Sequence, residues 1–285
     1  MSVDLVNAGE LDIKAEIKAV YFDVDGTLLD REGQYSPTLA QQIKRLRQRG
    51  IKTAVASGRP HFASQFLFDE LRLIDPGVFC SGAYIYNPQS QKSVGQRVLQ
   101  QASAIALIQR LRELNIYYEL YTEQHYYYET DFAHHIRHLH AQHLRCQPVK
   151  ADLLTIVTNQ PVLKFIVGVD QVLNPFSLAQ LESEFAHLQF AYAALPAYPM
   201  WHFASVVDAD ASKHSAFDWL LNYHGIDADN VVAFGDSHSD EVFLTRAGVG
   251  VAMGNAPLDV KQIARFVTRN SWEDGVAYAL SRLIV

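Results

Sequence analysis

Apolar and polar residues follow two different spacings along this chain. Short apolar runs that end at Asp, Ser or Gly are typical of buried strands, whereas apolar residues three and four positions apart indicate helices. Leu39, Ile43 and Leu46 have the helical spacing, and they follow Ser36-Pro37, a pair suited to begin a helix. Gly50 can end this helix. The sequence therefore predicts a helix from about Ser36 to Gly50.

Strands and helices alternate near both ends of the chain, after a short polar segment that reaches about residue 16. The pattern predicts strands at 17–22, 51–56, 78–80, 206–207, 231–234, 249–252 and 266–267. It predicts helices after the second strand to about residue 73 and at 212–224, 240–247, 257 onward and 273–283. Such alternation indicates a parallel sheet with right-handed crossovers.

The middle of the chain has a different pattern. It predicts a hairpin at 83–98, helices at 102–114, 131–144 and 174–187, and strands at 116–121, 125–129, 163–169 and 189–194. Adjacent strands indicate an antiparallel α+β unit. The fold class is therefore α/β: a Rossmann-like core of residues 1–86 and 197–285, with an α+β domain inserted at 87–196.

Composition and charge narrow the classes of function. The 285 residues hold 24 Lys and Arg against 31 Asp and Glu, a formal net charge of −7. This balance argues against a nucleic-acid partner but is compatible with a small phosphorylated molecule. Two cysteines, Cys80 and Cys146, do not make a disulfide scaffold. No apolar run approaches a membrane span, and the acidic first residues are unlike a signal peptide. We expect a soluble cytoplasmic protein; the sequence does not predict its oligomeric state.

The segment Asp23-Val-Asp25-Gly-Thr follows the first predicted strand directly. In open α/β sheets, ligands bind at the carboxyl ends of strands. One carboxylate there can act as a nucleophile and the other as general acid and base. The alternative is a structural turn, because Asp-Gly is common in turns.

A second acidic segment, Gly235-Asp236-Ser-His-Ser-Asp240, also follows an apolar strand. Carboxylate oxygens are the ligands that Mg²⁺ prefers, and close carboxylates favour a divalent cation. The alternative is helix capping, since acids stabilise the start of a helix. That alternative is strong for Asp240 and weaker for Asp236.

Two further sites could hold a phosphoryl group. Ser57 and Gly58 follow the second strand, where a hydroxyl and backbone N–H groups can bind phosphate. Lys213 lies at the start of a predicted helix, where the helix dipole makes a positive charge unfavourable. A functional role for this charge would explain its position. A simple loop and an exposed lysine are the alternatives.

These four segments, in this order, resemble the haloacid dehalogenase superfamily and in particular its Cof-type phosphatases. The run Gly250-Val-Ala-Met-Gly-Asn-Ala256 and the segment Glu273-Asp274-Gly275-Val276 are also similar to that family. The similarity covers nearly the whole chain and is weak across the middle. It implies a C2-type cap at residues 87–196 that selects the substrate.

The resemblance implies a role for each residue. Asp23 would attack phosphorus and form an aspartyl phosphate, and Asp25 would protonate the leaving alcohol and then activate water. Mg²⁺ would be bound by the carboxylates of Asp23 and Asp236 and the backbone carbonyl of Asp25. Asp240 would orient metal-bound water or complete the metal shell. Ser57, Gly58 and Lys213 would hold the phosphate. Sugar phosphates and pyridoxal phosphate are the expected substrates.

Three residues depart from the family pattern: Ser239, Ser81 and His214 stand where Asn, Asn and Gly are usual. They affect fine contacts and the choice of substrate more than the reaction. A phosphomutase of the phosphomannomutase type remains an alternative, as does a non-catalytic phosphate-binding module.

The helix predicted at 131–144 is rich in histidine. His134 and His138 have a spacing that can hold Zn²⁺, but no nearby acid or cysteine completes a set. We expect a solvated helix on the inserted domain. Tyrosines between Tyr117 and Tyr128 alternate at strand spacing, so they could stack on a substrate ring or pack in a sheet.

Overall fold

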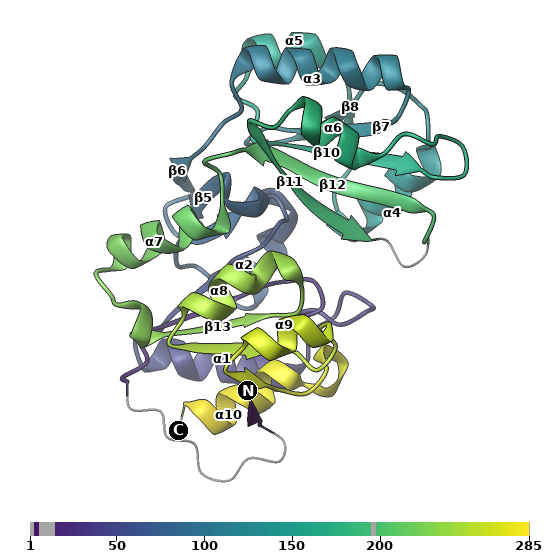
Figure 1. Cartoon of the computed structure of the whole chain (residues 1–285). Helices are drawn as coiled ribbons and strands as arrows, with labels where there is room; N and C mark the ends of the chain where they lie inside the picture. The colour runs from purple at the N-terminus through teal and green to yellow at the C-terminus, as the bar shows by residue number, and fades with distance from the viewer. Residues whose placement is uncertain (1–2, 6–14, 195–197, 285) are drawn as a thin grey trace. The chain divides into compact units, whose positions relative to one another are not determined.

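The computed structural model describes residues 3–5, 15–194 and 198–284. The described residues form two compact units (Figure 1). The first unit holds the residues up to Gly58, Gln65–Val94 and the residues from Lys213 onward. The second holds Arg59–Ser64 and Gly95–Ser212. The chain therefore leaves and re-enters the first unit, as an inserted domain requires.

The first unit is built on a six-stranded sheet in which every described pair is parallel. Its strands, in spatial order, are β1 (Val3–Asp4), β15 (Phe266–Val267), β14 (Val249–Ala252), β13 (Val231–Gly235), β2 (Ala19–Phe22) and β3 (Lys52–Val55). Every residue of β2 and β13 is buried, which explains why both read as unbroken apolar runs. The predicted parallel α/β core is confirmed.

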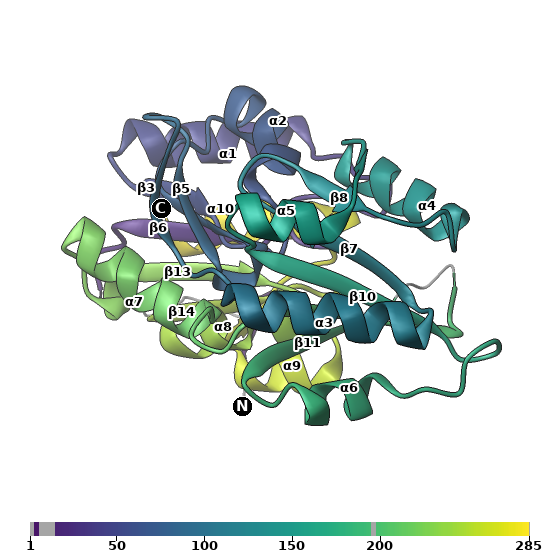
Figure 2. The same cartoon turned by 90° about the horizontal axis from the view of Figure 1, so that it is seen from above.

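Helices cover this sheet. They are α1 (Pro37–Gln48), α2 (Gln65–Glu70), α7 (Lys213–His224), α8 (Glu241–Arg246), α9 (Leu258–Ile263) and α10 (Gly275–Leu283). Helix α1 begins as predicted: the Ser36 hydroxyl accepts a hydrogen bond from the Leu39 N–H at 3.0 Å. Helices α1 and α10 lie side by side (Figure 2). Helices α7 and α8 bring Phe217 and Phe243 edge-on against Tyr21 of β2.

Three features of the first unit differ from the sequence prediction. The segment expected as a third parallel strand, β4 (Gly77–Phe79), pairs antiparallel with β5 (Tyr84–Asn87), which is followed by β6 (Lys92–Gln96). A single parallel bridge, Ala56 to Val78, links it to the end of β3. The helix expected to reach residue 73 ends at Glu70, before the left-handed Arg72. The polar lead-in contributes the edge strand β1, whose partner is far away in the sequence.

The second unit has its own six-stranded sheet. The spatial order is β11 (Leu188–Ala194), β12 (Trp201–Asp208), β10 (Lys164–Asp170), β7 (Tyr117–Tyr121), β8 (Tyr126–Tyr128) and β9 (Val149–Lys150). All of its pairs are antiparallel except the short β8–β9 pair. Strand β12 pairs with β10 and β11, so residues expected to open the second part of the core belong to this unit instead.

Helices α3 (Gln101–Leu114), α5 (Leu153–Asn159) and α6 (Leu178–Glu184) pack against one face of the second sheet. Helices α3 and α5 lie side by side in Figure 2. The sequence prediction missed α5, which begins where the Asp152 carboxylate accepts hydrogen bonds from Leu154 and Thr155 N–H groups. The antiparallel α+β unit expected in the middle of the chain is confirmed.

The other face of this sheet buries a charged group. Glu119 is fully buried and accepts hydrogen bonds from the hydroxyls of Tyr117 and Tyr121. It also lies 2.7 Å from Nδ1 of His140, on α4 (His134–Leu144). Burial alone would raise the pKa of Glu119, but His140 and the tyrosine hydroxyls lower it below its ordinary value. Both tyrosines therefore serve the sheet's internal packing, and His140 is an anchor of α4.

The remaining histidines of α4 have a different environment. His134, His135, His138 and His143 are exposed, in agreement with a largely solvated helix. Within the described parts of the chain, no group of potential metal-binding side chains includes His134 or His138.

We expect Glu119→Ala to lower the free energy of unfolding by about 3 kcal/mol, because it leaves two buried tyrosine hydroxyls and the half-buried His140 without their acceptor. Urea denaturation measures this loss. The lowered pKa of Glu119 means that its stabilisation exists at neutral pH and fades in acid, below its ordinary pKa of 4.5. The matched control is Glu184→Ala, which removes an exposed partner of Arg110 and should have a far smaller effect. Equal stability of the two variants would contradict this assignment.

Candidate active site

The acidic residues singled out from the sequence converge at the carboxyl ends of two neighbouring strands. Strands β2 and β13 are paired in parallel, so Asp23 and Asp236, which follow them, leave the same edge of the sheet. The Asp23 N–H donates to the Phe234 carbonyl at 3.0 Å and extends this pairing. Ser57 follows β3, the other neighbour of β2. Parallel pairing thus gathers segments that lie far apart in the sequence.

Carboxylate oxygens of Asp23, Asp236 and Asp240 all lie within 4.8 Å of one another. Asp23 is 7% exposed, Asp240 is 1% exposed and Asp236 is half-buried. The Asp25 carboxylate is not part of this group; Asp25 lies half-buried in the turn that bridges back to Leu29. The structure therefore assembles the acid cluster with Asp240, for which the resemblance implied a supporting role.

Burial among like charges shifts two of these carboxylates. Burial raises the pKa of Asp23 well above its ordinary value, and the Asp240 charge raises it further, while Lys213 acts in the opposite direction. Burial and the Asp240 charge together raise the pKa of Asp236 to about 7. A nearby positive charge would stabilise the ionised form of both carboxylates. An all-oxygen, buried and mutually repelling set of acids fits a hard divalent cation such as Mg²⁺.

Lys213 supplies one positive charge. Its ammonium is 2.6 Å from Oδ1 of Asp240 and 3.9 Å from Oδ1 of Asp23, and it donates to the Ala56 carbonyl at 3.1 Å. Burial alone would lower the pKa of Lys213, but the carboxylates of Asp240 and Asp23 raise it above its ordinary value. The side chain is therefore a buried cation held at the acid cluster, although Lys213 is the first residue of α7.

Asp240 holds the loop that carries Asp236. Its Oδ2 accepts hydrogen bonds from the backbone N–H groups of Asp236 and Ser237 at 3.1 and 3.0 Å, and from the Ser237 hydroxyl at 3.0 Å. Its Oδ1 accepts from Lys213. The capping interaction considered from the sequence is therefore present, and it coexists with a place in the acid cluster.

Ser57 and Gly58 form a turn beside a strained segment. Ser57 is 2% exposed, its N–H donates to the Val78 carbonyl at 2.9 Å, and its carbonyl accepts from the Ser81 N–H at 3.4 Å. Cys80 and Ser81 both have positive φ angles, 50° and 59°, which non-glycine residues rarely adopt. Strained backbone often accompanies functional sites. The departure from the family pattern at Ser81 therefore lies against the predicted phosphate-binding turn.

Gly26 meets a requirement that the sequence analysis did not recognise. Its φ is +79°, and a Cβ atom at this position would lie 2.3 Å from Oδ2 of Asp236. Asn255 was also missed; its side chain donates hydrogen bonds to the Gly26 carbonyl and to Asp236. The resemblance at 250–256 included Asn255 without a role. Only the folded chain reveals these contacts.

The other two departures lie near Lys213. The Ser239 hydroxyl is 3.5 Å from the Lys213 ammonium and donates to Asp240 at 3.4 Å. The His214 ring is largely exposed, 3.7 Å from Asp218 on the next turn of α7. Ser239 therefore contacts the buried charges, whereas His214 does not.

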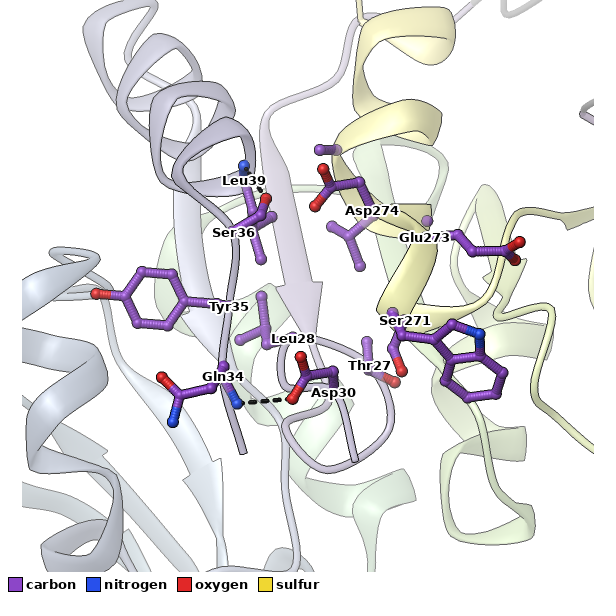
Figure 3. Close-up of a pocket in the computed structure, with 14 residues that line it drawn as sticks. Thr27, Leu28, Asp30, Gln34, Tyr35, Ser36, Leu39, Ser271, Glu273 and Asp274 are labelled. Atoms are coloured by element: carbon purple, nitrogen blue, oxygen red, sulfur yellow. Dashed lines mark hydrogen bonds between the residues drawn. The ribbon is translucent and has the colours of Figure 1, made fainter. Parts of the chain in front are cut away.

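A separate pocket of about 240 Å³ lies beside this site in the first unit, between the 27–36 loop and the start of α10 (Figure 3). Thr27, Ser36, Ser271 and Asp274 are among the residues that line it. None of the residues predicted to be catalytic, metal-binding or phosphate-binding lines this pocket.

Comparison with known proteins identifies the family. Residues 20–280 match the sequence profile of the haloacid dehalogenase-like hydrolases. The chain belongs to this family. The resemblance derived from the motifs is thereby confirmed.

Among the described residues, no helix is both long enough and apolar enough to cross a membrane.

Several members of this hydrolase family are similar over most of the chain. The pyridoxal phosphate phosphatase YbhA of Escherichia coli is 29% identical, over 94% of this chain and 99% of that protein. The 5-amino-6-(5-phospho-D-ribitylamino)uracil phosphatase YitU of Bacillus subtilis is 26% identical, over 90% of this chain and 94% of that protein. The crystal structure of a haloacid dehalogenase-like hydrolase from Bacteroides thetaiotaomicron matches with a TM-score of 0.83 and 27% identity, covering 94% of this chain and 100% of that one.

We expect Gly26→Ala to lower the melting temperature more than Gly50→Ala does. Both glycines have nearly the same positive φ, so each substitution costs about 1–2 kcal/mol of backbone strain. Nothing lies within 4 Å of the Gly50 position, whereas the new methyl at residue 26 must displace the Asp236 carboxylate. Thermal unfolding in EDTA measures the difference. Identical melting temperatures would show that the Asp236 side chain moves aside without a loss of stability.

We expect Asp236→Asn to stabilise the metal-free protein above pH 7. Since the pKa of Asp236 is raised to about 7, the folded state prefers the protonated acid, and stability falls as the pH rises from about 4 through 7. An amide does not ionise and avoids this loss. Melting temperatures in EDTA at several pH values test it: the advantage of the variant should vanish in acid. An advantage that did not change with pH would contradict the repulsion.

Proposed function

We propose that the protein is a phosphatase that hydrolyses phosphate monoesters of small metabolites, with Asp23 as the nucleophile. The observation that supports this most is the buried Asp23 carboxylate, 3.9 Å from the Lys213 ammonium and clustered with Asp236 at the end of the central strands. A site that only binds phosphate has no need for a buried carboxylate there, because a negative charge repels the ligand. A nucleophile with a cation beside it fits phosphoryl transfer.

The proposed reaction has two steps. A carboxylate oxygen of Asp23 attacks phosphorus, the bond from phosphorus to the alcohol oxygen breaks, and Asp25 gives its proton to that oxygen. Asp25 then takes a proton from a water molecule, and the water oxygen attacks phosphorus. The bond from phosphorus to the Asp23 oxygen breaks, which releases inorganic phosphate and restores the Asp23 carboxylate. Ser57, Gly58 and Lys213 hold the phosphoryl oxygens during both steps.

Mg²⁺ is the proposed cofactor, held by the carboxylates of Asp23 and Asp236 and by the Asp25 carbonyl. When bound, it supplies the positive charge that keeps the carboxylates ionised and offsets the charge of the phosphoryl oxygens. We assign Asp240 a supporting role, because its oxygens already accept hydrogen bonds from Lys213 and from the loop that carries Asp236. Asp240 would hold the Lys213 ammonium and the loop that carries Asp236 in fixed positions relative to each other.

The names of two relatives support a proposal for the substrate class. YbhA is named for pyridoxal phosphate and YitU for a phosphoribitylamino-uracil, and both names describe a small ring compound with one phosphate. We propose a substrate of this kind or a sugar phosphate, selected by the cap at residues 87–196. A panel of pyridoxal phosphate, sugar phosphates and nucleotides, compared by kcat/KM, would rank these substrates.

We expect p-nitrophenyl phosphate to be hydrolysed in Mg²⁺ and not in EDTA, and Asp23→Asn to lower kcat at least about 1,000-fold. Release of p-nitrophenol measures both effects. Asp218→Asn, which changes an exposed carboxylate on α7, is the matched control and should retain activity. Full activity of Asp23→Asn, or of the metal-free protein, would overturn the mechanism.

The role of Asp25 needs a comparison of leaving groups. An alkoxide requires a proton in order to leave, whereas p-nitrophenolate does not. Asp25→Asn should therefore lower kcat/KM much more for an alkyl phosphate than for p-nitrophenyl phosphate. Equal losses for the two esters would argue against a general acid at this position.

A further inference from the structure

Asn255 joins three separate segments of the first unit. Its Nδ2 donates hydrogen bonds to the Gly26 carbonyl at 2.9 Å and to Oδ2 of Asp236 at 3.1 Å. Its Oδ1 accepts a hydrogen bond from the Ser271 N–H at 2.9 Å. The three partners fix the orientation of the amide, because the reversed amide would place its oxygen against two acceptors. Asn255 thus presents its donor side to Asp236.

The two oxygens of the Asp236 carboxylate have different donors. Oδ2 accepts from Asn255, and Oδ1 accepts from the Thr27 hydroxyl at 3.3 Å. Each carboxylate oxygen can accept twice, so each keeps a lone pair for another partner. The glycine at position 26 leaves the space that Oδ2 occupies. The plane of the carboxylate is therefore set by groups on two sides, and the Asn255 contact is the shorter of the two.

We propose that Asn255 is a positioning residue of the metal site: it holds the Asp236 carboxylate in the orientation that Mg²⁺ requires. This inference rests on the proposed function. Mg²⁺ demands near-ideal octahedral geometry, so a ligand that can rotate binds it less well than a ligand held in place. Groups that hydrogen-bond to metal ligands commonly change metal affinity by 10- to 100-fold when they are removed.

The position of Asn255 explains why it can hold Asp236 rigidly. Asn255 follows β14, the neighbour of β13, whose end carries Asp236. Its acceptor is anchored by Ser271, the first residue of a 3₁₀ turn that precedes α10. Ser271 and Thr27 line the same pocket (Figure 3). Both donors to Asp236 are therefore tied to the two segments that line this pocket, the 27–36 loop and the turn before α10.

The test is Mg²⁺ binding to the metal-free full-length protein, measured by calorimetric titration. We expect Asn255→Ala to weaken Mg²⁺ binding by about 10-fold. The Mg²⁺ concentration for half-maximal hydrolysis of p-nitrophenyl phosphate should rise by a similar factor. Asn255→Leu, which keeps the branched shape of the side chain without a donor, should give the same loss if it folds. Circular dichroism and the melting temperature in EDTA report whether each variant is folded.

Asn230→Ala is the matched control. The Asn230 side chain donates to the Glu16 carbonyl, a contact in the same unit that involves none of the clustered acids. This variant should bind Mg²⁺ as the wild type does. Wild-type Mg²⁺ affinity in a folded Asn255 variant would overturn the inference, as would an equal loss in Asn230→Ala. If the wild-type protein binds Mg²⁺ but hydrolyses no phosphate ester, the proposed function fails and the positioning role stands on the binding data. If the wild type binds no Mg²⁺, both fail.

Discussion

The contact between the Lys213 ammonium and the Asp240 carboxylate is the interaction on which the candidate site depends. Both groups are almost completely buried, so each would be costly without the other. The pair places a cation beside Asp23, and the second oxygen of Asp240 holds the backbone of the Asp236 loop. Without this contact, Lys213 would not be held beside Asp23. The loop that carries Asp236 would also lose the hydrogen bonds from its backbone to Asp240.

The charge balance of the cluster remains incomplete even with Lys213. Burial and mutual repulsion raise the pKa values of Asp23 and Asp236, so the fold holds these carboxylates in a state that favours uptake of positive charge. The Mg²⁺ ion that we propose as cofactor would relieve this repulsion. Under the proposed function, that ion and Lys213 would supply the positive charge with which a chain of net charge −7 binds a phosphate ester.

Glu119 shows the opposite solution to the same problem. Its carboxylate is as deeply buried as Asp23, but two tyrosine hydroxyls and His140 satisfy it and lower its pKa. Such a group is structural, because its partners within the sheet and on α4 already satisfy the carboxylate. The two units therefore differ chemically: the first clusters mutually repelling acids at the ends of its strands, and the second surrounds its buried acid with hydrogen-bond partners.

The sequence by itself determined the elements with strong periodicity, the parallel class of the core sheet and the acids that follow its strands. These signals are local, since apolar spacing and capping residues act within a few positions. Tertiary structure alone decided which distant groups meet. The antiparallel pairing of β4, the membership of β12 in the second unit, the burial of Glu119 and the contact of Asn255 with Asp236 depend on neighbours remote in the chain. No local pattern records them, because hydrogen-bond partners and burial are set only when the sheets assemble.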